Sequence, residues 1–324
     1  MCCYRTRRYT YWKRIGGGSK VKKVAKLVGL SIILLILIFV STLIDQKYLS
    51  FAVINKVLTL FIGAWFPKLI RYSVDLVDND NWKASQRKLE RAGILKKNTI
   101  IRISFAYLFR IKVDGKYFLV PNTRSCKYQP VGGAYKFCNE EAQYLSSSMS
   151  IENDDRVPVN KTTKNDYRLL VKDKYLRAFV KRFDITEDRE NGSNLSREFE
   201  EEIFSTGILT KKSFGSHLSY KYCGRHMTDI QYGSIFEHYE LLLADVFEVQ
   251  LSEKQEELFR NLMDKKSDKY YFATSDEIKS FGVSTVTNKF TDNIATHTPK
   301  IITENTENLS KREKTSPIIE IALK

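Results

Sequence analysis

A cluster of glutamates follows one arginine in a chain that is otherwise basic. Residues 197–202 read Arg-Glu-Phe-Glu-Glu-Glu, although the formal net charge of the protein is +15. On an α-helix, Glu198, Glu201 and Glu202 fall within an arc of roughly 100°. Three carboxylates on one face repel each other unless a cation or an arginine offsets their charge. Because Mg²⁺ binds carboxylate oxygens, the array is a candidate metal site.

The residues around these glutamates also fit a helix that packs on a core. Phe199 and Ile203 are one turn apart and predict a buried stripe. Arg197 can pair with Glu201 across one turn, and Asn194 or Ser196 can cap the helix start. A plain surface helix with solvated charges has the same pattern, so both interpretations stay open at this point.

The order of residues resembles the Nudix signature, G-x5-E-x7-R-E-U-x-E-E-x-G-U. Its second half resembles residues 197–202, and its glycines resemble Val-Gly-Gly-Ala-Tyr-Lys at 131–136. We expect Gly132 and Gly133 to supply unusual dihedral angles or close backbone approach. The resemblance implies that Glu198, Glu201 and Glu202 are metal ligands, with Arg197 as the bracing residue. In an active hydrolase, Glu201 and Glu202 would be catalytic. However, Glu140 follows Gly133 by seven positions instead of six, and a long insertion separates the halves. This separation favours recognition of a nucleotide over its cleavage.

Two apolar stretches precede this region. Leu27 to Ile44 contains no charge and is long enough to cross a bilayer as a helix. Leu49 to Phe66 is interrupted by Asn55 and Lys56, and a charge near the bilayer centre costs about 3 kcal/mol. A lysine near a helix end can extend to the interface, so we predict a second transmembrane helix. The alternative is an amphipathic helix that lies in the membrane interface.

The charge distribution predicts the topology. Residues 1–26 hold nine lysines and arginines and no acid, and such a basic arm stays in the cytoplasm. Two spans would return the following domain to the same side. The five cysteines have neither disulfide-framework nor metal-ligand spacing, which fits a reducing compartment. The prediction is a multi-pass membrane protein, with its N-terminus and its globular domain in the cytoplasm.

The rest of the chain predicts an α+β domain. We expect a helical stalk at 75–97, a domain at 98–282 and a polar, flexible tail at 283–324. Within the domain we expect a hairpin around Asp114-Gly115, a strand and a basic helix in 167–183, and a helix at 252–266. Ser275 is the expected N-cap of a short helix. The fold class is therefore a transmembrane hairpin followed by a Nudix-like mixed-sheet domain with a large insertion in the box.

The combination of a two-span N-terminus with a split Nudix box resembles one family in particular. It is similar to the transmembrane Nudix-type effectors of bacterial antiphage cyclic-oligonucleotide systems (CBASS), which carry a SMODS-associated Nudix domain. The resemblance implies a cyclic-oligonucleotide ligand and homo-oligomeric assembly of the hairpin on activation. Damage to the inner membrane and abortive infection would follow. Candidate ligand contacts are basic and aromatic: Arg124, Lys127, Tyr128, Tyr135, Lys136, Arg177, Lys181 and Arg182.

Two other functions fit parts of the sequence. The Arg-Glu-x-x-Glu-Glu half suits a membrane-tethered, Mg²⁺-dependent hydrolase of a nucleoside diphosphate derivative. The net charge suits a nucleic-acid binder, but the positive-inside rule already explains most of that charge. We therefore expect a non-enzymatic effector that requires no cofactor, with Mg²⁺ as the one metal its acids would suit. We expect no partner of the nucleic-acid polymer class.

Overall fold

The chain divides into two compact units, Met1–Asn79 and Asp80–Lys324. The computed structural model describes residues 16–43, 49–77, 81–154, 156–160, 163–284, 287–309 and 316–323. The first part of the predicted basic arm and Ile44 lie outside these ranges. Each unit is considered separately below.

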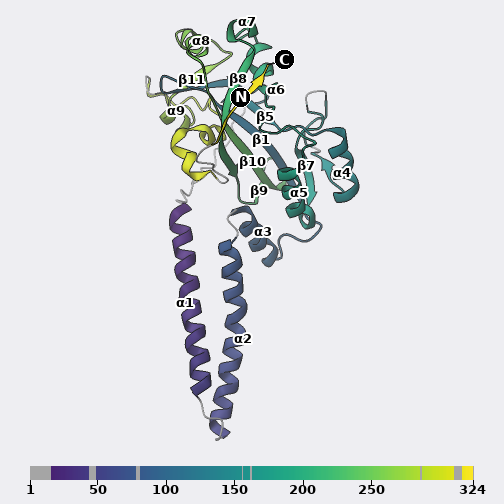
Figure 1. The fold of residues 1–324 in the computed structure, drawn as a ribbon, viewed down its shortest axis with the longest axis vertical. Helices are drawn as coiled ribbons and strands as arrows, with labels where there is room; N and C mark the ends of the chain where they lie inside the picture. Colours follow the sequence, from purple (N-terminus) through teal and green to yellow (C-terminus); the bar gives the residue numbers. More distant parts are fainter. Residues whose placement is uncertain are drawn as a thin grey trace, which may run out of the picture. The chain divides into compact units, whose positions relative to one another are not determined.

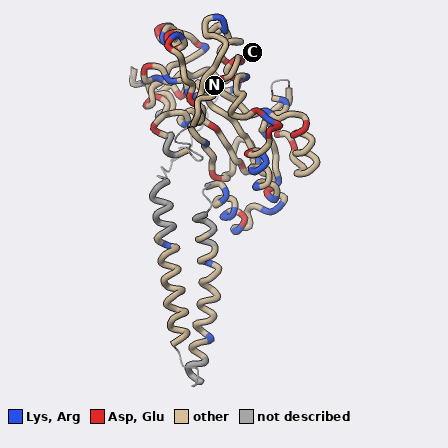
Figure 2. Tube along the Cα trace, viewed as in Figure 1, with Lys and Arg blue, Asp and Glu red and all other residues tan. Residues whose placement is uncertain are grey.

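The N-terminal unit consists of two long helices, α1 (Gly16–Leu43) and α2 (Leu49–Val77) (Figure 1). Each is long and apolar enough to cross a membrane, with mean hydropathies of 2.5 over Ala25–Leu43 and 1.4 over Val53–Ile70. Figure 2 shows few charged residues along them. The helix α2 continues through Pro67 to Val77, beyond the expected end at Phe66, and α1 already begins within the predicted arm.

A polar pair joins the two helices within their apolar segments. The Ser41 hydroxyl donates a hydrogen bond of 2.5 Å to Oδ1 of Asn55. A side-chain amide in hydrocarbon needs a partner, because no water is available there. The residue that weakens the second apolar stretch in the sequence is therefore used to join α1 and α2.

The second unit begins with α3 (Asn81–Arg91), which corrects the predicted stalk. Trp82 is only 1% exposed and belongs to the main hydrophobic core. The Gln86 amide donates to Oδ1 of Asp173 at 2.8 Å and accepts from Nε of Arg177 at 2.8 Å. These buried contacts make α3 part of the globular unit, where the sequence suggested a polar connector.

A mixed eight-stranded sheet forms the centre of the globular unit (Figure 1). The strand order is β12-β8-β10-β1-β7-β6, with β5 paired to β1 and β9 paired to β10. Only the central β1–β10 pairing is parallel among these described strands. The strands are β1 (Ile100–Arg110), β5 (Gly132–Ala134), β6 (Glu152–Asn153), β7 (Arg168–Lys172), β8 (His217–Met227), β9 (Gln231–Gly233), β10 (His238–Val249) and β12 (Ile318–Ala322).

The two faces of this sheet are covered differently. Ile103, Phe105 and Tyr107 of β1 are fully buried on the first face, in one core with the aromatic residues of the neighbouring helices. Those helices are α4 (Asn139–Met149), α5 (Asp173–Ile185), α6 (Arg197–Phe199) with the π-helical turn η1 (Glu200–Phe204), and α7 (Lys211–Phe214). On the second face, Leu108 and Ala244 belong to a smaller core. This alternation along β1 fixes which side chains can reach each face.

A smaller sheet packs beside the main one, in the order β11-β3-β2 with β4 paired to β3. Its strands are β2 (Lys112–Val113), β3 (Lys116–Pro121), β4 (Tyr128–Gln129) and β11 (Tyr271–Ala273). The turn at Asp114-Gly115 connects β2 and β3, which confirms the predicted hairpin. The helices α8 (Glu253–Met263) and α9 (Ser275–Lys279) follow the expected order, but Thr274 and not Ser275 caps α9.

The described parts of the predicted C-terminal tail are packed, which corrects that expectation. Ile294 and Ile301 are fully buried against the second face of the main sheet. This segment contains the 3₁₀ turns η2 (Thr298–Ile301) and η3 (Thr303–Asn308), and β12 then pairs with β8. Scattered isoleucines among threonines and asparagines gave no period in the sequence, so the packing was not predicted.

Candidate functional site

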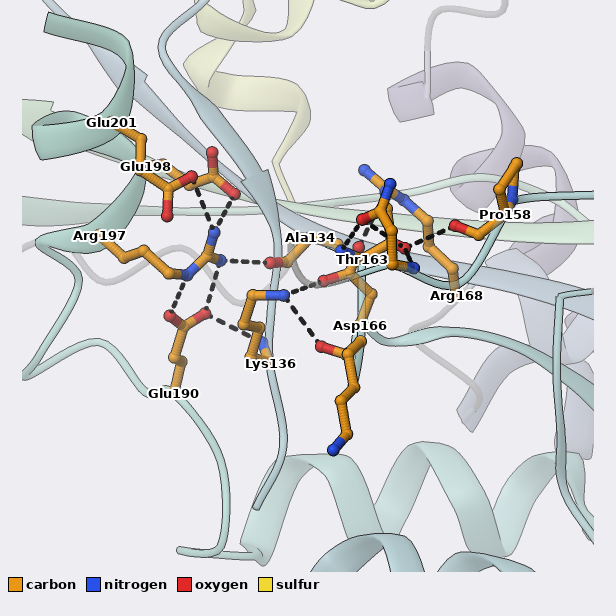
Figure 3. Close-up of polar contacts among 12 residues, drawn as sticks. Ala134, Lys136, Pro158, Thr163, Asp166, Arg168, Glu190, Arg197, Glu198 and Glu201 are labelled. Carbon is orange, nitrogen blue, oxygen red and sulfur yellow. Dashed lines mark hydrogen bonds and ion pairs between the residues drawn. The ribbon is translucent and has the colours of Figure 1, made fainter. Parts of the chain in front are cut away.

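The fold brings the two separated halves of the Nudix-like box into contact. The edge strand β5 carries Gly132 and Gly133, and the helical segment of α6 and η1 carries Arg197 and the glutamates. Phe199 and Ile203 are fully buried, so they fix this segment on the first face of the sheet. The polar sides of the two halves therefore meet at the edge of β5, as Figure 3 shows.

The residues between the halves are an integral part of the fold. They include β7, which pairs with β1, and α5, whose Phe179 and Phe183 are fully buried in the main core. The described residues that separate β5 from α6 thus supply two strands, β6 and β7, and two helices, α4 and α5. Removing them would expose the core.

The two glycines of β5 are needed for different reasons. Gly132 has a φ of +145°, and a Cβ there would lie 2.2 Å from the main-chain oxygen of Tyr107. Gly133 has ordinary backbone angles, but a Cβ would lie 2.0 Å from Oε1 of Glu198. The expectation that these glycines provide unusual dihedral angles or close approach is confirmed. Any side chain at Gly133 would displace the first glutamate of the array.

Arg197 is the centre of the polar cluster. Its Nε and Nη2 donate to the two carboxylate oxygens of Glu190 at 2.8 and 3.1 Å, and Nη1 donates to Glu198 at 2.6 Å. Nη2 also donates to the main-chain oxygen of Ala134 at 2.9 Å. The predicted pair with Glu201 is the longest contact, at 3.8 Å. Burial lowers the pKa of Arg197, but bonding to Glu190 and the charge of Glu198 outweigh burial and raise it.

Glu190 is the site residue that the sequence analysis missed. Glu190 precedes Arg197 by seven positions, one fewer than the first glutamate of the signature does. Its carboxylate also accepts a hydrogen bond from the main-chain N–H of Lys136 at 2.9 Å. The position that aligns with the first glutamate of the signature is 189, which holds an arginine. For this reason the sequence comparison did not find Glu190. By contrast, Glu141, next to the glutamate considered in the sequence, is fully buried and bonded to Arg182. Glu140 itself is exposed.

The three predicted metal ligands differ in their surroundings. Oε2 of Glu202 accepts from the Gly132 N–H at 2.8 Å, whereas the Glu201 side chain is 49% exposed. Burial and then the neighbouring charge of Glu198 raise the pKa of Glu202 to about 8. Burial also raises the pKa of Glu198, against the lowering effect of Arg197.

The helix geometry explains why the array is more open than expected. Ser205 N–H bonds to the Glu200 oxygen five residues earlier, which is the π pattern, so the angular step per residue is smaller than in an α-helix. Glu198, Glu201 and Glu202 consequently do not share a single tight face. Neither Asn194 nor Ser196 caps the start through its side chain.

The carboxylate oxygens of these glutamates are ligands that a hard cation prefers, but the glutamates are not arranged around one point. Among the described residues, no group of three or more His, Cys, Asp or Glu side chains is placed to hold a metal ion. Glu198 is bonded to Arg197, and Glu202 to Gly132. Each still has one carboxylate oxygen outside these bonds, so Glu198, Glu201 and Glu202 are the residues that would hold Mg²⁺ if it binds.

The candidate ligand contacts from the sequence are not collected in one place. Tyr135 is 1% exposed and donates to Asp245 at 2.8 Å, so its ring has no free face for a base, and we withdraw it. Lys136 donates to Asp166 at 2.7 Å, beside Arg168, as Figure 3 shows. Arg182 binds Glu141 and lies over the Tyr144 ring at 4.3 Å.

The other candidates lie on separate surfaces. Arg124 is exposed in the turn before β4. The pKa of Arg168 is lowered mainly by the burial of Arg168 and further by the charge of Arg124. Lys127 pairs with Asp292 at 2.9 Å, and Tyr128 stacks on Tyr271. Arg177 and Lys181 are exposed on α5. Arg124 and Glu198 of the box both influence Arg168 electrostatically. Ligand contact by any of the exposed residues stays a prediction.

Comparison with known proteins places these observations in one family. A model of the SMODS-associated NUDIX domain matches residues 100–302 of this chain. Among solved structures, a NUDIX hydrolase from Nitrosomonas europaea is similar at 12% identity, over 56% of this chain and 82% of that chain, with a TM-score of 0.22. No curated protein matches the chain. The matched residues include β5, Arg197 and η2, and extend past the expected boundary at residue 282.

Proposed function

The chain belongs to the SMODS-associated NUDIX domain family, and from this premise we propose that it is a ligand-gated membrane effector. Its Nudix-type domain would bind a cyclic oligonucleotide made during phage infection. Binding would cause the membrane helices of several copies to assemble and to break the integrity of the bacterial inner membrane. The outcome would be abortive infection, with the N-terminus and the globular domain in the cytoplasm.

The observation that carries the proposal is the state of the reassembled box. Arg197 joins the strand of the glycines to the glutamates, since it is engaged with Glu190, Glu198 and the main-chain oxygen of Ala134. Glu198 and Glu202 each have an oxygen bonded within the protein, to Arg197 and Gly132. A rigid site with internally bonded acids suits recognition of a nucleotide better than clamping of a metal during hydrolysis.

The membrane part of the proposal rests on α1 and α2. Both helices meet the length and hydropathy of a span, and the described apolar segments are almost entirely exposed within the unit. Apolar surface of this kind requires lipid or other helices around it. Coupling between the two units would make the lipid-exposed helices respond to a ligand that binds the globular unit.

Leakage from liposomes tests the proposal. Purified full-length protein is reconstituted with an enclosed dye, and cyclic dinucleotides and trinucleotides are added after their binding has been measured by calorimetry. We expect at least one of them to bind and to release the dye, whereas its linear form does neither. Sealed liposomes in the presence of every cyclic nucleotide that binds would overturn the proposal.

A matched pair of variants locates the response. Glu198→Gln changes a residue that contacts Arg197 and the backbone of Gly133, so we expect weaker binding and less leakage. Glu200→Gln removes the same charge from the neighbouring turn, on another side of the helix, and should leave both unchanged. Equal effects of the two variants would mean that net charge, and not the box, controls the response.

A Mg²⁺-dependent hydrolase is the second candidate, because Arg197, Glu198, Glu201 and Glu202 are all present beside the glycines. It predicts metal-dependent turnover of a nucleoside diphosphate derivative that is lost in the Glu201→Ala, Glu202→Ala double variant. Glu200→Ala is the control. Absence of turnover across a broad panel of such compounds with Mg²⁺ and Mn²⁺ would exclude this function.

A further inference from the structure

Basic side chains dominate the first helix of the globular unit and the turn that follows it. Residues 81–97 contain six lysines and arginines but a single acid, Glu90. By contrast, α8 carries three glutamates and two basic residues, which is the mixture of an ordinary solvated helix. Trp82 and Gln86 are buried against the core, so the exposed basic side chains of α3 lie on its outer side. The charge of this segment is therefore one-sided.

The turn after α3 combines basic and apolar side chains on a fixed backbone. The main-chain N–H groups of Ile94 and Leu95 both bond to the oxygen of Leu89, at 3.0 and 3.3 Å. Leu95 is buried, whereas Lys96 and Lys97 are exposed. The Ile94 side chain is 47% exposed between these basic residues. An apolar side chain among cations is the composition of a segment that lies in a membrane interface.

The helix α5 adds to the same surface, although it comes much later in the chain. The main-chain N–H of Lys174 bonds to the oxygen of Lys97 at 3.1 Å, and Nε of Arg177 donates to Gln86 at 2.8 Å. Figure 2 shows lysines and arginines gathered along α3 and α5. A topology signal acts through residues near a membrane span, so it does not account for those of α5. The basic surface consists of Lys88, Arg91, Lys96, Lys97, Lys174 and Arg177.

The turn between β9 and β10 presents a second apolar side chain beside α3. The main-chain N–H of Ile230 donates to Oγ of Ser85 on α3 at 2.8 Å. The turn is held to β1 as well, since the Arg102 guanidinium lies 3.6 Å from the centre of the Phe236 ring. Ile235 is nevertheless 83% exposed, more than any other large apolar side chain among the described residues. A rigid turn that exposes an isoleucine suits contact with an apolar partner.

The covalent chain indicates which partner is near. Only residues 78–80 separate the end of α2 from the start of α3. An extended chain covers about 3.5 Å per residue, so Asn81 lies within about 14 Å of Val77. Where α2 crosses a bilayer, the surface of that bilayer is thus within reach of α3. Anionic lipid headgroups attract lysines and arginines at such a distance.

We propose that the basic surface, together with Ile94 and Ile235, docks the globular unit on anionic phospholipid. The ammonium and guanidinium groups donate to lipid phosphates, and the two isoleucines enter the boundary between headgroups and acyl chains. The inference rests on the proposed function in one respect, namely that α2 is held in a bilayer. It gives Arg177 a lipid partner, in place of the nucleotide contact expected from the sequence.

Amide hydrogen exchange of the full-length protein in nanodiscs tests the docking. The protein is studied without nucleotide in nanodiscs of phosphatidylcholine alone and of phosphatidylcholine mixed with phosphatidylglycerol. At low salt, we expect the anionic lipid to slow exchange in residues 92–97 and 231–237 by about threefold or more. High salt should remove the difference, because it screens exposed charges. Residues 253–263 of α8 are the internal reference and should exchange equally in both nanodiscs.

Two matched triple variants separate the basic surface from net charge. One variant replaces three exposed lysines of the basic surface by glutamine: Lys88→Gln, Lys96→Gln and Lys97→Gln. The control replaces three exposed lysines in α8 and just after it: Lys254→Gln, Lys265→Gln and Lys266→Gln. We expect the first variant to lose the slowing caused by anionic lipid and the control to keep it. Both variants remove the same charge, so only the place of removal differs.

A single variant tests the apolar contact. Ile235→Ser should lose the slowing in residues 231–237 and keep most of it in residues 92–97, because the lysines there are intact. Unchanged slowing in residues 231–237 would remove Ile235 from the docking surface.

Equal exchange of the unmodified protein in the two kinds of nanodisc would overturn the proposal, and so would equal losses in the two triple variants. Slowing by added single-stranded DNA, without slowing by phosphatidylglycerol, would assign the surface to nucleic acid and also overturn it. Co-elution of the protein with the nanodiscs reports separately whether the helices hold it in lipid. A protein that co-elutes but does not dock would leave the proposed function intact, since dye leakage tests that function.

Discussion

Two clusters of arginine and carboxylates in the globular unit have similar components but different balances of charge. In the buried cluster, Arg225 donates to Asp245 at 2.7 and 2.9 Å and to Asp184 at 2.6 Å. The second cluster is the box, where Arg197 faces Glu190, Glu198, Glu201 and Glu202. In the first cluster, both carboxylate oxygens of Asp245 have hydrogen-bond partners. In the second cluster, four glutamates face one arginine.

An excess of carboxylates over cationic side chains, and not the mere presence of carboxylates, distinguishes a binding site from a structural ion pair. Asp245 also accepts hydrogen bonds from Tyr135 and Tyr222, so every oxygen has a partner. At the box, partial burial and then the charge of Glu198 raise the pKa of Glu202 to about 8. The first arrangement is compensated within the protein, whereas the second keeps carboxylate oxygens of Glu198, Glu201 and Glu202 outside its internal bonds.

The largest expected effect is in the buried cluster. Asp245→Ala leaves the Arg225 guanidinium buried without its main partner, which typically costs about 3–5 kcal/mol. The free energy of unfolding from chemical denaturation measures the loss. Glu256→Ala, in an exposed pair with Arg260, is the control and should cost less than about 1 kcal/mol. A loss as small as that of the control would show that Asp245 does not hold the first cluster together.

The two glycines of the box should differ from each other. Gly132→Ala combines a left-handed φ with a contact to the Tyr107 backbone, which cannot move aside, so a loss of about 3 kcal/mol is expected. Gly133→Ala meets only the flexible end of Glu198 and should cost about 1 kcal/mol or less. Ligand binding should nevertheless fall in Gly133→Ala, because Glu198 must move. Equal unfolding free energies for the two variants would contradict the close approach at Gly132.

Glu202 should make stability depend on pH in a defined direction. Its pKa is raised from its ordinary 4.5 to about 8 in the folded state, so the folded protein binds the proton more tightly between these values. The stabilising contribution is complete below about pH 4.5 and is lost as the pH rises through about 8. Glu202→Gln should therefore flatten the pH profile and stabilise the protein at pH 8.5. Parallel profiles for the two proteins would contradict the raised pKa.

The smallest effect is expected at the exposed end of the array. The Glu201 side chain is 49% exposed and contacts Arg197 only at 3.8 Å. Glu201→Gln should change the free energy of unfolding by less than about 0.5 kcal/mol. A destabilisation comparable to that of Asp245→Ala would mean that the two clusters do not differ as described.

Local features of this protein were predictable because neighbouring residues produce them. The apolar helices, the hairpin at Asp114-Gly115 and the strand and helix within 167–183 all follow from periodicity and turn residues. The roles of Gly132 and Gly133 followed from the limited reasons for placing glycine in a strand. Boundaries were less accurate, since α2 continues past Phe66 and since packing drew α3 and the described C-terminal segment into the structure.

The sequence by itself determined the chemical groups of the box, the apolar helices and the α+β character, because each depends on composition or on residues a few positions apart. The contacts of Arg197 with Glu190 and the burial of Tyr135 became visible only in the folded chain. These relations depend on contacts between segments far apart in the chain, and such contacts leave no periodic signal. The physical reason is that burial and charge compensation, which set the pKa values and the available surfaces, exist only after the chain has folded.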